Sequence, residues 1–178
     1  MKYLSKALAL FLAVAMLASF MVACGGKKDE GKSDSASQAE DTNKVAGSEQ
    51  TWGDITVFVP DTMDFKGGDG TFNPEDPKTV WLTAKDKPTD YIKVTIVKSE
   101  DDAKNNINTT KEINKDYNPV DSSVKINDAI EWKGITYNAG GTDCCMLYTV
   151  AGDKVYFVMD GGYKDNDDTL LEVLKSLK

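Results

Sequence analysis

The feature that most constrains the fold is a run of strand-like segments in the second half of the chain. EWKGITYN (131–138), DCCMLYTV (143–150) and KVYFVMD (154–160) are rich in β-branched and aromatic residues, as strands are. Only Ala151 to Asp153 separates the last two segments, and its Gly-Asp pair is typical of a tight hairpin. Because tight hairpins join antiparallel strands, this part of the chain predicts an antiparallel sheet.

Earlier segments continue the same pattern. In DITVFVP, the apolar residues Ile55, Val57 and Val59 alternate with Thr56 and Phe58, and the segment stops at a proline. A charged connection that contains a proline, KDKPTD, predicts a hairpin between two later segments. Further strands are expected at 79–84, 91–97 and 123–127.

A helix is expected after Ser99, which can cap its N-terminus. The acidic residues 100–102 would fill the first turn, where the helix dipole favours negative charge. Ala103, Ile107 and Ile113 would form its apolar face.

The chain closes with DTLLEVLKSLK, which predicts a second helix. Thr169 and Glu172 have the spacing of a capping box. The apolar face of this helix would consist of Leu170, Leu171, Leu174 and Leu177. The sequence therefore predicts an α+β fold, with an antiparallel β-sheet packed by helices and a closing C-terminal amphipathic helix.

The N-terminus has the pattern of an export signal. Lys2 and Lys6 precede an apolar run from Ala7 to Ala23. The run ends in Met-Val-Ala-Cys-Gly, which resembles the lipobox of bacterial lipoproteins. The resemblance implies that Cys24 is lipidated, for instance by palmitate, after residues 1–23 are removed as a signal peptide. An uncleaved membrane span is the alternative, since the run is just long enough to cross a bilayer.

Either reading places the rest of the chain outside the cytoplasm, at the cell membrane. Residues 24–50 contain the lipidated cysteine and a polar stretch without aromatics, which predicts a flexible tether. Residues 51–178 would then form a single domain. Within it, the glycine-rich stretch 61–78 shows no period, so it either contains a short helix or is a long loop with a role in function.

The composition excludes several classes of function. All 21 basic residues are lysine, because the chain has no arginine and no histidine. Without histidine it lacks the usual general base near neutral pH and the usual imidazole metal ligand. The net charge of −8 opposes nucleic-acid binding. We therefore expect no nucleic-acid partner, no Ser-His-Asp hydrolysis and no cofactor.

The order of the segments resembles the PsbP-like fold, which occurs in photosystem accessory proteins and in many bacterial lipoproteins. The resemblance rests on ITVFVP, on IEWKGITYN, on the hairpin around AGDK and on DTLLEVLKSLK, and it spans most of residues 54–178. It implies an antiparallel sheet packed by helices that acts as a binding or accessory module. It implies no catalytic residues.

Cys144 and Cys145 are adjacent, and their role has several interpretations. Neighbouring residues of a strand point to opposite faces, so two separated, buried thiols are the ordinary expectation. A disulfide between neighbours would need a strained ring and would act as a redox switch. A shared metal ion is disfavoured, because the two sulfurs diverge.

Two acidic loops suggest a calcium site. Asp160, Asp165 and Asp167, with the neighbouring Asp168, form one set of carboxylates, and the segment DTMDFKGGDG forms another. Neither has the spacing of an EF-hand, and aspartate with glycine is also ordinary turn composition.

Tryptophans offer another kind of site. Trp81 and Trp132 would form either a platform for a sugar or peptide or part of the core.

The leading hypothesis is a membrane-anchored extracytoplasmic lipoprotein that acts as a non-enzymatic binding or accessory module of the cell envelope. Its partner would be an envelope protein, a polymer or a small ligand. One alternative is a thiol-based redox sensor or enzyme that uses Cys144 and Cys145. A further alternative is a calcium-stabilised wall protein.

Overall fold

The computed structural model describes residues 45–70 and 72–178. Nearly half of these residues form antiparallel strands, and two α-helices and one short 3₁₀ helix, η1, accompany them. In chain order the elements are β1 (Gly47–Trp52), β2 (Ile55–Pro60), β3 (Met63–Gly67), β4 (Thr79–Ala84), β5 (Tyr91–Val97), α2 (Glu100–Ile113), η1 (Lys115–Tyr117), β6 (Val120–Lys125), β7 (Glu131–Ala139), β8 (Thr142–Ala151), β9 (Lys154–Gly161) and α3 (Asp168–Ser176). This arrangement confirms the predicted α+β class.

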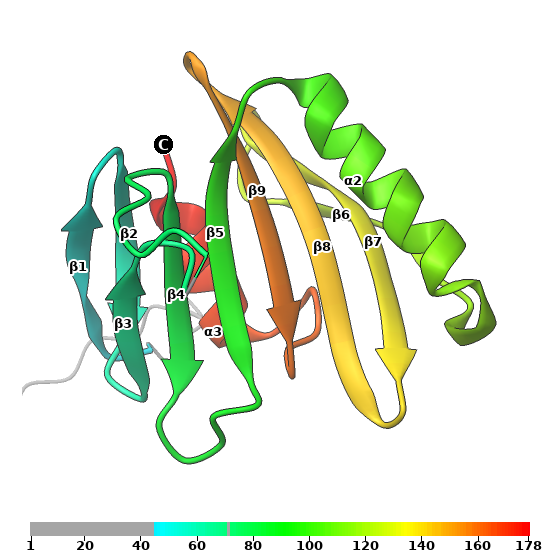
Figure 1. The fold of residues 1–178 in the computed structure, drawn as a ribbon, viewed down its shortest axis with the longest axis horizontal. Coiled ribbons are helices and arrows are strands. Elements are labelled where there is room, and N and C mark those ends of the chain that lie inside the picture. Colours follow the sequence, from blue (N-terminus) through cyan, green and yellow to red (C-terminus); the bar gives the residue numbers. More distant parts are fainter. Residues whose placement is uncertain (1–44, 71) are drawn as a thin grey trace, which may run out of the picture. The chain divides into compact units, whose positions relative to one another are not determined.

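Seven strands form one antiparallel sheet in the order β3-β4-β5-β9-β8-β7-β6 (Figure 1). The last strand of the chain, β9, therefore lies between β5 and β8 and joins two consecutive three-strand meanders. The expected hairpin at Ala151–Asp153 is present, since β8 pairs with β9 up to the pair Ala151 and Lys154. A separate two-stranded sheet consists of β1 and β2.

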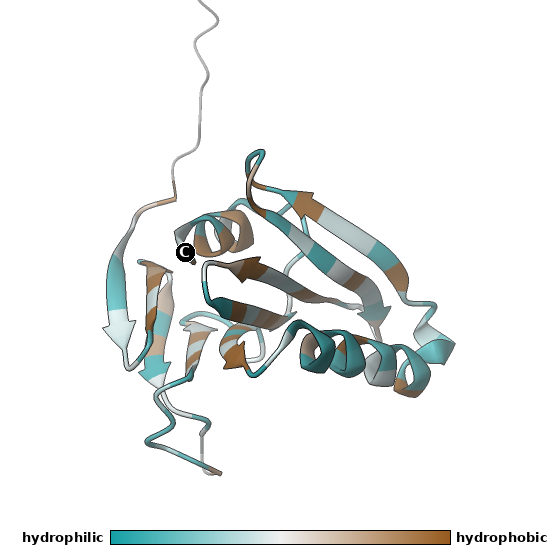
Figure 2. Ribbon diagram, turned by 90° about the horizontal axis from the view of Figure 1, so that it is seen from above, coloured by the Kyte–Doolittle hydropathy of each residue, from teal (hydrophilic) through white to brown (hydrophobic). Residues whose placement is uncertain are grey.

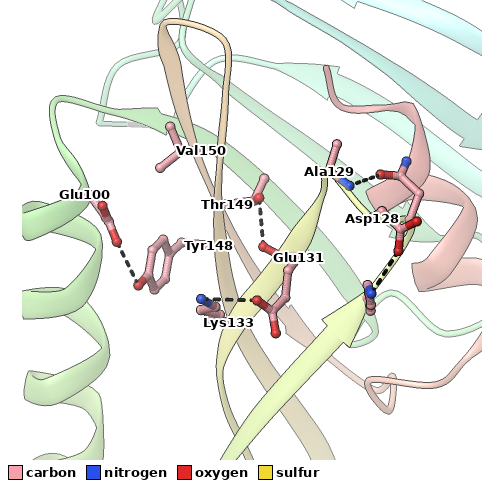
Figure 3. A pocket seen from close by; sticks show the side chains of 10 residues that line it. Glu100, Asp128, Ala129, Glu131, Lys133, Tyr148, Thr149 and Val150 are labelled. Carbon is pink, nitrogen blue, oxygen red and sulfur yellow. Dashed lines mark hydrogen bonds and ion pairs between the residues drawn. The ribbon is translucent and has the colours of Figure 1, made fainter.

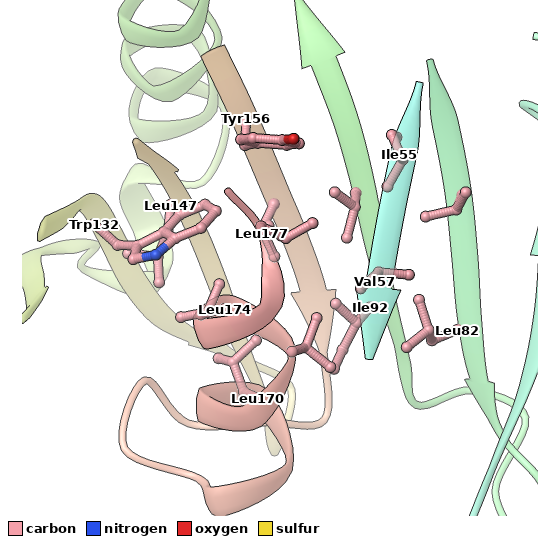
Figure 4. Packing of buried hydrophobic residues seen from close by; sticks show 14 of the residues in the cluster. Ile55, Val57, Leu82, Ile92, Trp132, Leu147, Tyr156, Leu170, Leu174 and Leu177 are labelled. Carbon is pink, nitrogen blue, oxygen red and sulfur yellow. The ribbon is translucent and has the colours of Figure 1, made fainter. Parts of the chain in front are cut away.

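Helices cover the two faces of the large sheet, with α3 on one side and α2 on the other (Figure 2). Alternation along β8 separates the two cores: Cys145 and Leu147 belong to the α3 side, and Met146 and Tyr148 to the α2 side. The larger core packs the inward residues of β2 and the sheet against α3 (Figure 4). Residues labelled there include Ile55, Val57, Trp132, Leu147, Leu170, Leu174 and Leu177.

Helix α2 begins as predicted, because the Ser99 hydroxyl accepts a hydrogen bond of 3.1 Å from the Asp102 backbone N–H. Ala103 and Ile107 are buried against the sheet. The prediction for Ile113 is wrong, since its side chain is 75% exposed. Ile113 follows Ile107 by six residues, which is not a whole number of turns at 3.6 residues per turn.

Helix α3 buries Leu170, Val173 and Leu174. Its cap differs from the predicted Thr169 capping box. The Asp167 carboxylate accepts a hydrogen bond of 2.8 Å from the Thr169 backbone N–H, so Asp167 is the N-cap. Thr169 lies inside the first turn and cannot cap the helix.

Two strands lie where the sequence indicates none. Strand β1 begins at Gly47, so the folded part starts before the expected boundary at residue 51. Its residues are nearly all exposed, and it is held by backbone pairing with β2. Its sequence therefore shows no alternation of apolar and polar residues that would have predicted a strand. Strand β3 occupies part of the expected 61–78 loop, where it buries Met63. In addition, β6 begins at Val120, ahead of the expected 123–127.

The predicted signal peptide 1–23, Cys24 and most of the expected tether lie outside the described residues. Among residues 45–70 and 72–178, no helix is long and apolar enough to cross a membrane.

Candidate functional site

The two adjacent cysteines lie on opposite faces of β8, as the alternation predicts. Cys145 is buried in the α3-side core, and Cys144 is partly buried on the other face. Both are free thiols. The Cys144 thiol is 3.7 Å from the Thr142 carbonyl oxygen, to which it donates a weak hydrogen bond. The sheet separates the two sulfurs, so they do not converge on one another or on a common ion.

Both thiols are held in the neutral form. Burial is the main cause that raises the pKa of Cys145, and the nearby Asp160 carboxyl adds to it. Burial and Asp160 also raise the pKa of Cys144, although Tyr137 opposes part of this shift. Since the thiolate is the nucleophile, a raised pKa makes both cysteines less reactive than a free thiol. This arrangement gives the redox alternative little support.

Asp160 is a buried carboxyl group in β9, with only 2% of its surface exposed. Neither carboxyl oxygen makes a hydrogen bond of ordinary geometry. Burial raises its pKa to about 8, although the nearby Tyr163 backbone and Cys145 thiol lower it in part. The group is therefore largely protonated at neutral pH.

The three calcium candidates do not converge. Asp160 is buried, Asp165 accepts a 2.6 Å hydrogen bond from the Ser122 hydroxyl, and Asp167 caps α3. In the part of the chain that the structure describes, no three acidic, cysteine or histidine side chains are grouped to hold an ion. The calcium hypothesis therefore has no site at these residues.

The two tryptophans do not form an open platform. Trp132 is fully buried in the α3-side core. Trp81 is partly buried, with Lys93 Nζ 4.8 Å from the ring centroid and the Tyr91 ring 5.3 Å away. Lys93 in turn forms a 2.6 Å ion pair with Asp69, which fixes it over the ring.

A charged pocket of about 470 Å³ lies beside the start of α2 (Figure 3). Its polar groups already have partners. The Tyr148 hydroxyl donates to Glu100 at 3.2 Å, and Lys133 pairs with Glu131 at 3.1 Å. Lys125 pairs with a further carboxylate, that of Asp128, at 3.0 Å. A ligand would have to displace these contacts. The lining residues are Glu100, Lys125, Asn127, Asp128, Ala129, Glu131, Lys133, Tyr148, Thr149 and Val150.

A second pocket, which we name the β7-edge pocket, is the stronger candidate. Its volume of about 460 Å³ falls in the range of roughly 300–1,000 Å³ that is typical of small-molecule sites. It is lined by Tyr117, Asn118, Val120, Thr136, Tyr137, Asn138, Asp143, Cys144, Tyr163, Lys164, Asp165 and Asn166.

The pocket exists because two neighbouring strands differ in length. Pairing between β6 and β7 ends at Val120 and Thr136, whereas β7 continues to Ala139. Just before β6, η1 ends at Asn118, whose φ of 50° lies in the left-handed region. Asparagine tolerates this conformation better than most residues. The turn brings the segment around Tyr117 into the wall of the pocket.

The connection between β9 and α3 forms the opposite wall. Gly162 has a φ of 104°, and its backbone N–H donates a 2.7 Å hydrogen bond to the Asp143 carbonyl oxygen. The bond between Ser122 and Asp165 ties the same connection to β6. Residues 163–166 are thus held beside the free edge of β7.

Several polar groups of the β7-edge pocket are free to meet a ligand. Within residues 45–70 and 72–178, the side chains of Asn118, Lys164 and Asn166 make no hydrogen bond or ion pair. Burial, more than any other cause, raises the pKa values of Tyr137 and Tyr163 to about 12, so both phenols keep their protons. Such groups can donate and accept hydrogen bonds but cannot act as a base near neutral pH.

Of the predicted site residues, Cys144 and Asp165 line this pocket, whereas Cys145, Asp160 and Asp167 do not. The sequence reasoning missed the tyrosines and asparagines. A signal was present in the two Tyr-Asn pairs, Tyr117-Asn118 and Tyr137-Asn138, each of which lies near a turn.

No family model matches the sequence, and no curated protein matches it. Among solved structures, the chain is similar to a crystal structure from Bacteroides thetaiotaomicron VPI-5482, with 15% sequence identity and a TM-score of 0.41. The match covers 69% of this chain and 44% of the other, so the chain spans less than half of that protein's length. A likeness of this strength says nothing about function.

Proposed function

We propose that this chain is an extracytoplasmic lipoprotein, anchored to the membrane through Cys24, that serves as a non-enzymatic binding or accessory module of the cell envelope. The proposal of an anchor is supported by the apolar run that follows two lysines and by the lipobox-like residues before Cys24. We further propose that residues 51–178, together with β1, form a PsbP-like domain closed by an amphipathic helix.

The observation that carries the binding role is the set of free polar groups in the β7-edge pocket. A pocket whose donors and acceptors already pair with each other gains little from a ligand, because each new hydrogen bond replaces an old one. In the β7-edge pocket, Asn118 and Asn166 are exposed, so a ligand would replace only their hydrogen bonds to water and would break no contact within the protein. The neutral thiol of Cys144 and the protonated phenols favour recognition over chemistry.

The anchor is tested by expressing the full chain and its Cys24→Ala variant in a bacterial host. The full chain should be found in the membrane fraction with the added mass of acyl groups. The variant should lose this mass. An unmodified Cys24 in the mature wild-type protein would contradict the anchor.

The binding role is tested by sedimenting residues 25–178, which lack both the apolar run and the acylated cysteine, with isolated cell envelopes that have been stripped of protein. A double variant, Tyr163→Ala with Asn166→Ala, removes two groups of the β7-edge pocket. It should be retained several-fold less than wild type. Tyr148→Phe changes the charged pocket and should behave as wild type. Equal retention of all three proteins would exclude the β7-edge pocket as the binding site.

A further inference from the structure

The lining of the β7-edge pocket combines two kinds of side chain. Three tyrosines contribute rings that have an apolar face and a polar hydroxyl, and they come from η1, β7 and the β9–α3 connection. Val120 is the sole aliphatic residue in the described lining. The pocket therefore offers an apolar ligand little aliphatic surface to pack against.

Asparagine amides supply the second part of the recognition chemistry. Each amide offers a donor and an acceptor side by side, which suits a pair of neighbouring hydroxyl groups. Asn138 is fixed in place, because its amide donates to Asp143 at 2.9 Å and accepts from the Gly141 backbone N–H at 2.9 Å. Asn118 and Asn166 supply amides that remain free for a ligand.

Charge in the lining argues against an anion. Asp143 and Asp165 contribute two carboxylates, against the single ammonium group of Lys164. The chain as a whole carries −8, and it has no arginine to form a bidentate contact with a carboxylate or phosphate. A neutral ligand meets none of this repulsion.

A neutral sugar has the complementary features. One face of its ring presents C–H groups, which pack on aromatic rings, and its edge presents neighbouring hydroxyls, which pair with amides and carboxylates. Building on the function proposed above, we infer that the β7-edge pocket binds a neutral saccharide, with Tyr137 and Tyr163 contacting the sugar ring and with Asn118 and Asn166 binding its hydroxyls.

The test is calorimetric titration of the full chain, purified in detergent micelles, with two neutral probes, an N-acetylglucosamine tetramer and cellotetraose. A sialylated oligosaccharide and an uncharged octapeptide serve as comparison ligands. We expect saturable binding of at least one neutral saccharide at millimolar concentration or below, and weaker binding of the sialylated one. Sedimentation with an insoluble neutral glycan then distinguishes a polymer from a free sugar as the source of the ligand.

Variants assign the binding to the pocket. Asn118→Gly keeps the left-handed backbone and removes only the amide, so it should weaken binding without unfolding the protein. A lost hydrogen bond of this kind corresponds to roughly a tenfold loss of affinity. Tyr137→Leu removes the aromatic ring that packs on the sugar and should weaken binding by at least a similar factor. Asn105→Ala removes an exposed amide on α2, outside the β7-edge pocket, and should leave affinity unchanged.

Two results would overturn the inference. The first is saturable binding of the octapeptide or the sialylated oligosaccharide alone, which removes the neutral-saccharide class but leaves the binding module intact. The second is saccharide binding that neither Asn118→Gly nor Tyr137→Leu weakens. Failure of every ligand, together with equal envelope retention of wild type and the double variant, would remove the proposed function of this pocket as well.

Discussion

Cys145 on β8 and Asp160 on β9 are directly paired residues whose side chains are both buried on the α3 side of the sheet. A thiol and a carboxyl group thus lie side by side in the core, where burial disfavours the charged form of each. Both groups favour their neutral forms, for the same reason of burial. The pair makes the stability of the fold sensitive to pH.

Asp160 should make the protein less stable as pH rises from about 4 to about 8. Its folded pKa of about 8 lies above the ordinary value of 3.8, so between these values the folded state binds more protons than the unfolded state. The free energy of unfolding contributed by this group therefore falls across that window and is constant outside it. Asp160→Asn removes the titration. Relative to wild type, it should gain stability on the order of a few kcal/mol between pH 5 and pH 8.5.

Urea unfolding at both pH values measures this difference. Asp153→Asn, at an exposed hairpin carboxylate, should follow the wild-type pH dependence. A constant difference between Asp160→Asn and wild type at the two pH values would show that Asp160 is ionised in the fold throughout.

The two adjacent thiols should differ in their reactivity. Cys144 is partly buried and lines the β7-edge pocket, so an alkylating reagent should modify it slowly in the native full chain. Its raised pKa keeps the rate below that of a free cysteine. Cys145 should react only after unfolding. Peptide mass mapping before and after denaturation checks both statements. If neither cysteine reacted in urea until reductant was added, the thiols would be oxidised and the redox alternative would gain support.

Gly162 should be far less replaceable than Gly152, although both have positive φ. An alanine Cβ at Gly162 would collide with the Asp90 carboxyl group, whereas at Gly152 no atom lies within 4 Å. Gly152→Ala should cost about 1 kcal/mol, from backbone conformation alone. Gly162→Ala should cost at least about 2 kcal/mol more, because a clash is added. Equal losses in denaturant unfolding would mean that the connection to α3 moves aside freely.

Ile107 and Ile113 provide a matched pair on α2. Ile107→Ala opens a cavity against the sheet and should cost about 2–5 kcal/mol. Ile113→Ala should change stability by less than about 0.5 kcal/mol, since its side chain is exposed. Thermal unfolding of the two variants compares them directly. A large loss for Ile113→Ala would indicate that the end of α2 is covered in solution.

Much of the fold was predictable because its strands bury alternate apolar residues. Ile55, Val57 and Val59 show this alternation, and β2 lies where they indicate. Strand β1 was not predictable, since all its residues except the partly buried Trp52 are exposed, and most of it is held by backbone pairing with β2. The N-cap of α3 is Asp167 and not the predicted Thr169. Both residue types can cap a helix, so the local sequence alone does not show which of the two does so.

The candidate site was predictable only in part. Alternation along a strand was enough to place Cys144 and Cys145 on opposite faces. The β7-edge pocket, in contrast, brings together residues near 117, 137 and 163, which the chain order keeps apart. The pocket exists because β6 is shorter than β7 at one end. Sequence patterns do not predict the end of a strand to within one or two residues, so they could not predict this difference in length.

The position of β9 has a consequence for when the protein can fold. The meander of β3 to β5 and that of β6 to β8 share no strand pairing, and each pairs with β9. A ribosome releases β9 after the other eight strands, so a nascent chain cannot close the sheet until all of these strands have emerged. The core of α3, which follows β9, is completed later still. We propose that this chain is exported across a membrane. Late closure of the sheet would keep the chain unfolded, and so able to pass through a membrane channel, until export has begun.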